Sequence, residues 1–180
     1  MKRGFLFIML MALTLVVAAQ ETGNFGTDAP PPTSYVVFGP RVGVCGIFQD
    51  PLEFSTTMAS YFGEGTYHPV LSIFGFNFEY RILLGNSTDH FAVQTVFTLM
   101  GVEQSLFLPC FSTLIGYRHH SGFEFGVGPT LNISGVGVVA AIGYTIASNG
   151  VYVPLDLAFQ IPNKNQRPSL SFLTGFNFRK

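Results

Sequence analysis

The stretch that decides the fold is residues 74–84, Phe-Gly-Phe-Asn-Phe-Glu-Tyr-Arg-Ile-Leu-Leu. Large apolar side chains alternate there with small, polar or charged ones, which is the two-residue period of a β-strand with one apolar face. The same alternation returns along the chain between turn-forming residues. It predicts eight strands, at 34–48, 68–84, 89–103, 107–118, 122–134, 135–147, 151–161 and 168–178.

The length of these segments indicates the type of sheet. Several exceed the mean globular strand of about five or six residues and match the roughly nine to eleven tilted residues that cross a bilayer. Eight such strands joined in sequence predict an all-β fold, an antiparallel up-and-down β-barrel with one short loop helix.

Volume and charge decide which face of the barrel points outward. The interior of an eight-stranded barrel is just wide enough for side chains to fill, so it cannot hold the many aromatic and branched residues of the apolar face. Charged residues make up 11% of the chain, against about 25% in soluble domains. The apolar face is therefore expected to meet lipid, where only a closed barrel satisfies every strand backbone group.

The inward face then carries a small set of charges. Three cations and three anions could neutralise one another in a narrow lumen, which matters because an unpaired buried charge is costly. We expect a structural plug of paired charges, with a proton or ion path as the alternative. The six residues are Arg41, Glu79, Arg81, Arg118, Glu124 and Asp156.

One helix is expected between the first two strands. Asp50 can cap it, Pro51 suits its first position and Glu53 completes a pattern resembling a capping box. The residues expected on its apolar face could form a lid over the barrel mouth, lie at the membrane surface or pack on the rim as an ordinary loop helix. They are Phe54, Met58, Tyr61 and Phe62.

The N-terminal region is expected to direct export. Residues 1–19 show the charged, apolar and small-residue order of a cleaved secretory signal peptide. Residues 20–33, which include three consecutive prolines, indicate a flexible linker, so that the barrel domain covers 34–180.

The cysteines and the prolines within the predicted strands bear on the barrel prediction. Cys45 and Cys110 fall on the first and fourth strands, which a barrel separates beyond bridging distance, so two reduced thiols are favoured over a disulfide. Pro40, Pro129 and Pro154 fall inside strands, where each removes a hydrogen-bond donor and requires a bulge or a strand boundary.

The pattern over 34–178 resembles the small outer-membrane β-barrel proteins built on an OmpA-like or OmpX-like eight-stranded domain. The resemblance extends to Gly175-Phe176-Asn177-Phe178, which is similar to the aromatic assembly signal of such barrels. It implies a monomer in the bacterial outer membrane that contacts membrane lipid and lipopolysaccharide and is assembled by the barrel-assembly machinery. No basic tract suggests nucleic acid as a partner.

A short segment suggests an enzymatic alternative. Arg118-His119-His120-Ser121 resembles the pairing in outer-membrane lipid A deacylases, which implies His119 as general base and Ser121 as nucleophile. His119 and His120 are adjacent, and neighbours on a strand point to opposite faces, so we expect no metal site there and no cofactor. His68 and His90 are expected to be solvated imidazoles.

The function predicted from the sequence is a non-enzymatic barrel with a structural or interaction role and a plugged lumen. The alternatives are a lipid A-modifying hydrolase and a small pore or conduit for apolar molecules.

Overall fold

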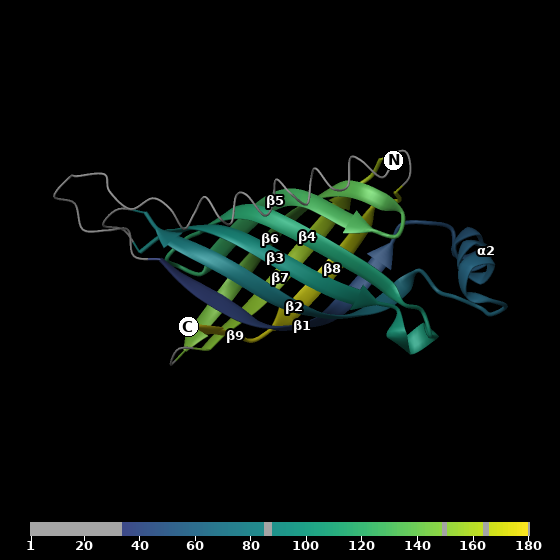
Figure 1. Cartoon of the computed structure of the whole chain (residues 1–180), viewed down its shortest axis with the longest axis horizontal. Helices are drawn as coiled ribbons and strands as arrows, with labels where there is room; N and C mark the ends of the chain where they lie inside the picture. The colour runs from purple at the N-terminus through teal and green to yellow at the C-terminus, as the bar shows by residue number, and fades with distance from the viewer. Residues whose placement is uncertain (1–33, 85–87, 149–150, 164–165, 180) are drawn as a thin grey trace, which may run out of the picture. The chain divides into compact units, whose positions relative to one another are not determined.

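The computed structural model describes residues 34–84, 88–148, 151–163 and 166–179 (Figure 1). The predicted signal peptide (1–19) and linker (20–33) lie outside these residues. The strands are β1 (Ser34–Ile47), β2 (Val70–Leu83), β3 (His90–Met100), β4 (Leu108–Arg118), β5 (Phe123–Asn132), β6 (Gly135–Ser148), β7 (Val151–Ile161), β8 (Ser169–Gly175) and β9 (Asn177–Arg179). The helices are α2 (Pro51–Phe62) and the 3-10 turn η1 (Val102–Gln104).

The strands form one closed antiparallel barrel. β2 to β7 each pair with their neighbours in sequence, and β1 pairs with β2 on one side and with β8 and β9 on the other. β9 continues the register of β8, so the two are one barrel strand interrupted at Phe176. The expected eight-stranded all-β barrel with one short loop helix is therefore confirmed, and the predicted last strand, 168–178, is divided.

The strand prolines explain this interruption. The paired registers on either side place Pro40 of β1 opposite Phe176 and Pro154 of β7 opposite Gly175, so neither neighbouring strand offers its N–H at the break. Pro129 likewise lies where the pairing of β5 with β4 skips two residues. Each proline thus coincides with a gap in the hydrogen-bond ladder, but the register is the same on both sides of each gap, so the expected bulges are absent.

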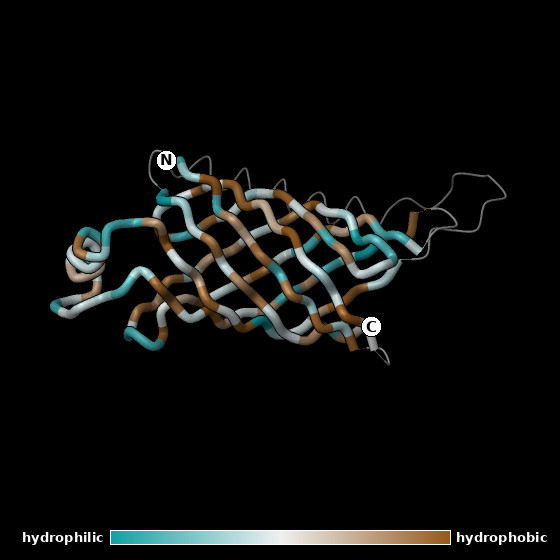
Figure 2. Tube along the Cα trace, turned by 180° about the vertical axis from the view of Figure 1, so that it is seen from behind, coloured by the Kyte–Doolittle hydropathy of each residue, from teal (hydrophilic) through white to brown (hydrophobic). Residues whose placement is uncertain are grey.

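The outward face of the barrel is apolar. Figure 2 shows hydrophobic residues recurring along the strands. Alternate positions on every long strand expose large side chains, including Phe74, Phe78, Phe97, Phe125 and Phe172. A barrel with this exterior is suited to lipid rather than water, because soluble proteins rarely expose apolar patches this extensive.

The two ends of the barrel differ in the connections between strands that lie there. The connections after β1, β3, β5 and β7 lie at one end, here called the loop end, and include α2 and η1. The beginning of β1, the end of β9 and the connections after β2, β4 and β6 lie at the other, here called the terminal end.

Helix α2 begins where its capping residues predict. The carboxylate of Asp50 accepts hydrogen bonds from the N–H groups of Leu52 and Glu53, at 2.9 and 3.1 Å, and Pro51 occupies the first turn. The Glu53 carboxylate does not complete a capping box and instead pairs with Arg167 at 2.6 Å. Gly63 ends the helix with a φ of 102°.

The packed face of α2 is narrower than expected. Phe54 and Met58 are buried, whereas Tyr61 is 73% and Phe62 is 38% exposed. The buried pair belongs to a cluster at the loop end with Tyr67, Leu71, Leu106 and Leu108. Of the four residues expected on the apolar face, Phe54 and Met58 therefore pack on the loop end, whereas Tyr61 and Phe62 remain exposed.

No helix among the described residues is long and apolar enough to cross a membrane.

Candidate functional site

The inward positions of the strands gather the six predicted charges inside the barrel. Five of them are nearly inaccessible to solvent, with Arg41, Glu79, Arg81, Arg118 and Glu124 between 2% and 6% exposed. Asp156 is half-buried. The strand period therefore places the six side chains in one interior layer, here called the charged layer.

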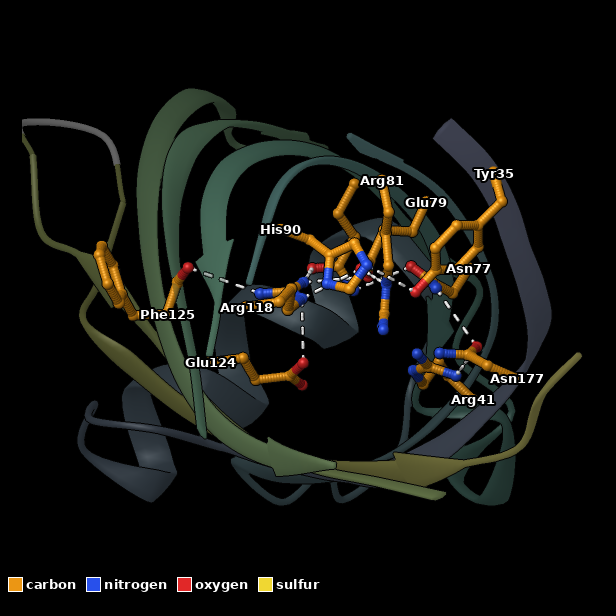
Figure 3. A network of polar contacts seen from close by, with 11 residues as sticks. Tyr35, Arg41, Asn77, Glu79, Arg81, His90, Arg118, Glu124, Phe125 and Asn177 are labelled. Atoms are coloured by element: carbon orange, nitrogen blue, oxygen red, sulfur yellow. Dashed lines mark hydrogen bonds and ion pairs between the residues drawn. The ribbon is translucent and has the colours of Figure 1, made fainter. Parts of the chain in front are cut away.

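Glu79 is the centre of this layer (Figure 3). Its carboxylate accepts from Nε of Arg81 at 2.5 Å and from both Nε and Nη2 of Arg118 at 3.0 Å. Two charged hydrogen bonds from one guanidinium hold the carboxylate in a fixed plane. Arg118 also contacts Glu124, its direct partner across β4 and β5, at 2.9 Å.

A second ion pair is linked to the first group by neutral amides. Arg41 lies 4.0 Å from Asp156, and its Nη1 donates to Oδ1 of Asn177 at 2.8 Å. Asn177 accepts from Asn77 at 3.4 Å, and Asn77 accepts from Gln94 at 2.9 Å. Gln94 then accepts from Arg118 at 3.0 Å, which closes the connection.

The sequence interpretation did not include these amides in the network. Asn77, Gln94 and Asn177 are each at most 9% exposed, and they connect charges that would otherwise form separate pairs. The signal was present, because all three obey the inward two-residue period of their strands. Selecting inward residues by charge alone missed these three, since an amide side chain both donates and accepts hydrogen bonds.

The charged layer separates two spaces in the lumen. On the loop side lies a cavity of about 100 Å³ lined mainly by small and apolar side chains, among them Cys45, Met100, Cys110 and Leu173. On the terminal side lies an opening of about 720 Å³ lined by residues that include Tyr35 and His119. Arg118 and Glu124 contribute to the walls of both spaces.

The two cysteines are free thiols. Both Cys45 and Cys110 line the cavity on the loop side. The structure agrees with the prediction that Cys45 and Cys110 are reduced thiols.

A cluster of polar side chains lies at the terminal end, where the β4–β5 turn meets the start of β3. Because His90 pairs with Arg118 across these strands, Asp89 stands beside the turn residues. The N–H of His120 donates to Oδ1 of Asp89 at 2.8 Å, and Nδ1 of His120 lies 3.1 Å from the same oxygen.

The two imidazoles of this cluster lie close together. The ring centroids of His119 and His120 are 3.9 Å apart. The expectation that adjacent histidines diverge is wrong here because both residues lie beyond the end of β4, where the turn replaces strand alternation. The turn is fixed by the N–H of Gly122, which donates to the carbonyl of His119 at 2.9 Å.

Asp89 is held as a carboxylate. The hydroxyl of Tyr117 donates to Oδ2 at 2.6 Å, and this bond, with that from the N–H of His120, lowers the pKa of Asp89 to about 2. A carboxylate that accepts several hydrogen bonds loses them when it is protonated, so the charged form is favoured.

The suggested catalytic residues, His119 and Ser121, are in contact. Nδ1 of His119 lies 2.8 Å from Oγ of Ser121. The same nitrogen accepts from the N–H of Ser121 at 3.3 Å, which is a local turn contact. The carboxylate of Asp89 contacts His120 and lies within 4.8 Å of a ring nitrogen of His119. The geometry therefore brings an imidazole, a hydroxyl and a carboxylate together at one turn.

The other two histidines differ from each other. His68 is exposed at the loop end, as expected. His90 is half-buried, with Nε2 3.1 Å from the hydroxyl of Tyr35. A solvated imidazole at His90 is therefore not what the structure shows.

No known protein family and no curated protein matches the chain in sequence. Among solved structures, the chain is similar to Ail, the attachment invasion locus protein of Yersinia pestis, in complex with the heparin analogue sucrose octasulfate. The identity is 13%, the TM-score is 0.50, and the match covers 83% of this chain and 99% of Ail. A second structure of Ail matches with 11% identity and a TM-score of 0.45 over 82% of this chain and 97% of Ail. The closed antiparallel strands, the inward polar residues and the first of these matches together show that the chain has the fold of the small, eight-stranded outer-membrane β-barrels.

Proposed function

We propose that the chain is a non-enzymatic bacterial outer-membrane protein with a closed lumen and a structural or interaction role. The observation that carries this proposal is that two layers of side chains lie inside the lumen. The charged layer occupies its middle, and an apolar layer occupies the loop end.

The charged layer is suited to a permanent plug. Its members contact one another or neutral amides, as the distances around Glu79 and Asn177 show. A charge removed from water is tolerated only when it is paired and hydrogen-bonded in this way. Moving any one of these side chains to admit a solute would leave its partners unpaired.

The apolar layer supports closure at the loop end. The cluster beneath α2 includes Phe54 and Leu106, each 2% exposed. A second cluster, formed by Cys45, Ile73 and Leu173, lies next to it, and Ile47 and Met100 pack against both. Burial of such side chains stabilises this layer by roughly 1.5–3 kcal/mol each, so opening it is costly.

An interaction role is supported by apolar side chains that project from the loop end outside the barrel wall. Leu52 and Tyr61 on α2 are 76% and 73% exposed, and Phe107 after η1 is 64% exposed. Exposed apolar patches typically mark contact sites, and these three side chains lie at the same end of the barrel. We propose that these residues contact a protein or a lipid surface.

The charges of the loop end argue against an anionic ligand such as the one crystallised with Ail. Arg167 is the one arginine or lysine among the described loop-end residues, and it is paired with Glu53. Asp50, Glu64 and Glu103 add further negative charge there. A negatively charged surface repels sulfated ligands.

The proposal also covers the location and the assembly of the protein. The apolar exterior favours insertion into the outer membrane, in contact with lipid and lipopolysaccharide, after export through the predicted signal peptide. We propose assembly by the barrel-assembly machinery and a monomeric state.

Conductance across planar lipid bilayers tests the closed lumen. The folded chain should insert without producing channel currents, and a general porin added to the same membrane serves as the positive control. Stable single-channel currents that scale with protein concentration would instead support the pore alternative.

A hydrolase acting on lipid A is the second candidate, and the 2.8 Å contact between His119 and Ser121 is the observation that favours it. The test is loss of an acyl chain from lipopolysaccharide, followed by mass spectrometry. We expect no loss with the unmodified chain. Deacylation that disappears in Ser121→Ala but persists in Ser134→Ala, an exposed turn serine at the loop end, would establish the enzyme.

A further inference from the structure

We infer that Asp89, His119 and His120 form a binding site for a divalent transition-metal ion, with Zn²⁺ as the representative ion. One carboxylate oxygen and one ring nitrogen from each histidine lie within 4.8 Å of one another. This cluster has no role in the closed lumen proposed above. Among the described residues, it is the one group of three or more histidine, cysteine or acidic side chains with its ligand atoms this close.

The donor set is that of a metal site. Two imidazoles and a carboxylate provide three protein ligands, which leaves positions for water, as in zinc sites that remain open to solvent. The same set also suits other borderline divalent ions, because nitrogen and oxygen ligands are shared among them. The exposed fraction of the His120 side chain, 58%, gives an ion direct access from solvent.

The distances are close to those that an ion requires. Ligand atoms placed about 2.1 Å from Zn²⁺ in tetrahedral directions stand about 3.4 Å apart. Oδ1 of Asp89 and Nδ1 of His120 are 3.1 Å apart. The remaining separations, all within 4.8 Å, would reach this spacing by rotation of the two imidazoles.

The surrounding structure holds the ligands in place. Tyr117 donates to the second oxygen of Asp89 at 2.6 Å, and Ser121 contacts Nδ1 of His119 at 2.8 Å. The N–H of His119 donates to the carbonyl of Phe123 at 2.8 Å, which ties the turn to β5. Partners of this kind orient metal ligands and reduce the cost of ordering them.

The experiment measures Zn²⁺ binding to the purified, detergent-folded chain without a polyhistidine tag, in competition with a chromophoric chelator. We expect one equivalent of Zn²⁺ per chain. Asp89→Asn, His119→Ala and His120→Ala should each weaken binding at least about 10-fold. His68→Ala is the matched control, because it removes an exposed histidine at the opposite end of the barrel and should leave binding unchanged.

A second measurement separates coordination from loss of folding. Co²⁺ bound by the chain should give a visible absorption band that is lost in Asp89→Asn, a variant with nearly the shape of the original side chain. Gel mobility before and after boiling shows whether each variant is folded. The inference is overturned if the chain takes up no stoichiometric Zn²⁺, or if folded Asp89→Asn and His68→Ala bind it equally well.

Discussion

Arg118 and Glu79 are 39 positions apart in sequence, and yet one guanidinium contacts both oxygens of one carboxylate, with Nε and Nη2 each at 3.0 Å. Neither residue is more than 6% exposed. β3 lies between the strands that carry them, so the contact crosses the lumen side of three adjacent strands. The stability of the barrel should depend strongly on this pair.

Glu79→Gln is expected to destabilise the folded barrel by about 3–5 kcal/mol, because it leaves two buried arginines short of a counter-charge. Urea-induced unfolding followed by far-ultraviolet circular dichroism measures the change, since the chain contains no tryptophan. The matched control is Glu53→Gln, which breaks the exposed pair with Arg167. That pair should contribute at most about 1 kcal/mol. Equal effects of the two substitutions would contradict the buried role of Glu79.

A charge on the outward face tests the contact with lipid. Phe78 lies in the middle of β2 and is 56% exposed. Phe78→Arg should cost about 2–4 kcal/mol on folding into lipid vesicles, because the charge meets hydrocarbon. Phe107→Arg is the control, since Phe107 is equally large, 64% exposed and outside the strands, where a charge costs at most about 1 kcal/mol even at the lipid interface. A small effect at both positions would show that Phe78 faces water.

The seam between the first and last strands depends on Gly39. A methyl group at this position would overlap the carbonyl oxygen of Phe176, at the break between β8 and β9. We expect Gly39→Ala to destabilise the barrel by about 1–3 kcal/mol or more through overpacking. Gly46→Ala controls for the general effect of alanine on the same strand, because its methyl group would lie 4.0 Å from the nearest atom, the carbonyl oxygen of Leu170. The fraction that resists unfolding on an unboiled gel distinguishes the two variants.

The lowered pKa of Asp89 predicts a contribution to stability that depends on pH. The folded pKa is about 2 against an ordinary value of 3.8. The unfolded state therefore binds the proton first, and the contribution is complete above about pH 4 and is lost as the pH falls toward 2. The difference in unfolding midpoint between the unmodified chain and Asp89→Asn should shrink across that interval. A constant difference would show that the carboxylate is not the group that titrates.

The barrel could be predicted from the sequence because a two-residue period assigns each side chain to one face, and volume then decides which face is inside. The six lumen charges follow from the same rule. Their partners do not, because pairing depends on strand register. Arg118 contacts Glu79 across β3 as well as its direct neighbour Glu124, and no local pattern specifies this arrangement.

The polar cluster at the terminal end could not be predicted from strand alternation. His119 and His120 converge because they lie in a turn, where strand alternation no longer applies. Asp89 joins them through the pairing of β3 with β4 from 31 residues away. The helix shows a similar limit, because helical spacing groups Tyr61 with Phe54, although only a narrow side of α2 packs against the loop end.

Residence in the outer membrane is the central claim, and fractionation of expressing cells followed by a heat-modifiability gel tests it most directly. The chain should be found in the outer-membrane fraction, should require detergent for extraction, and should migrate differently before and after boiling because the closed barrel resists unfolding. Recovery as a soluble periplasmic monomer without detergent would contradict the claim.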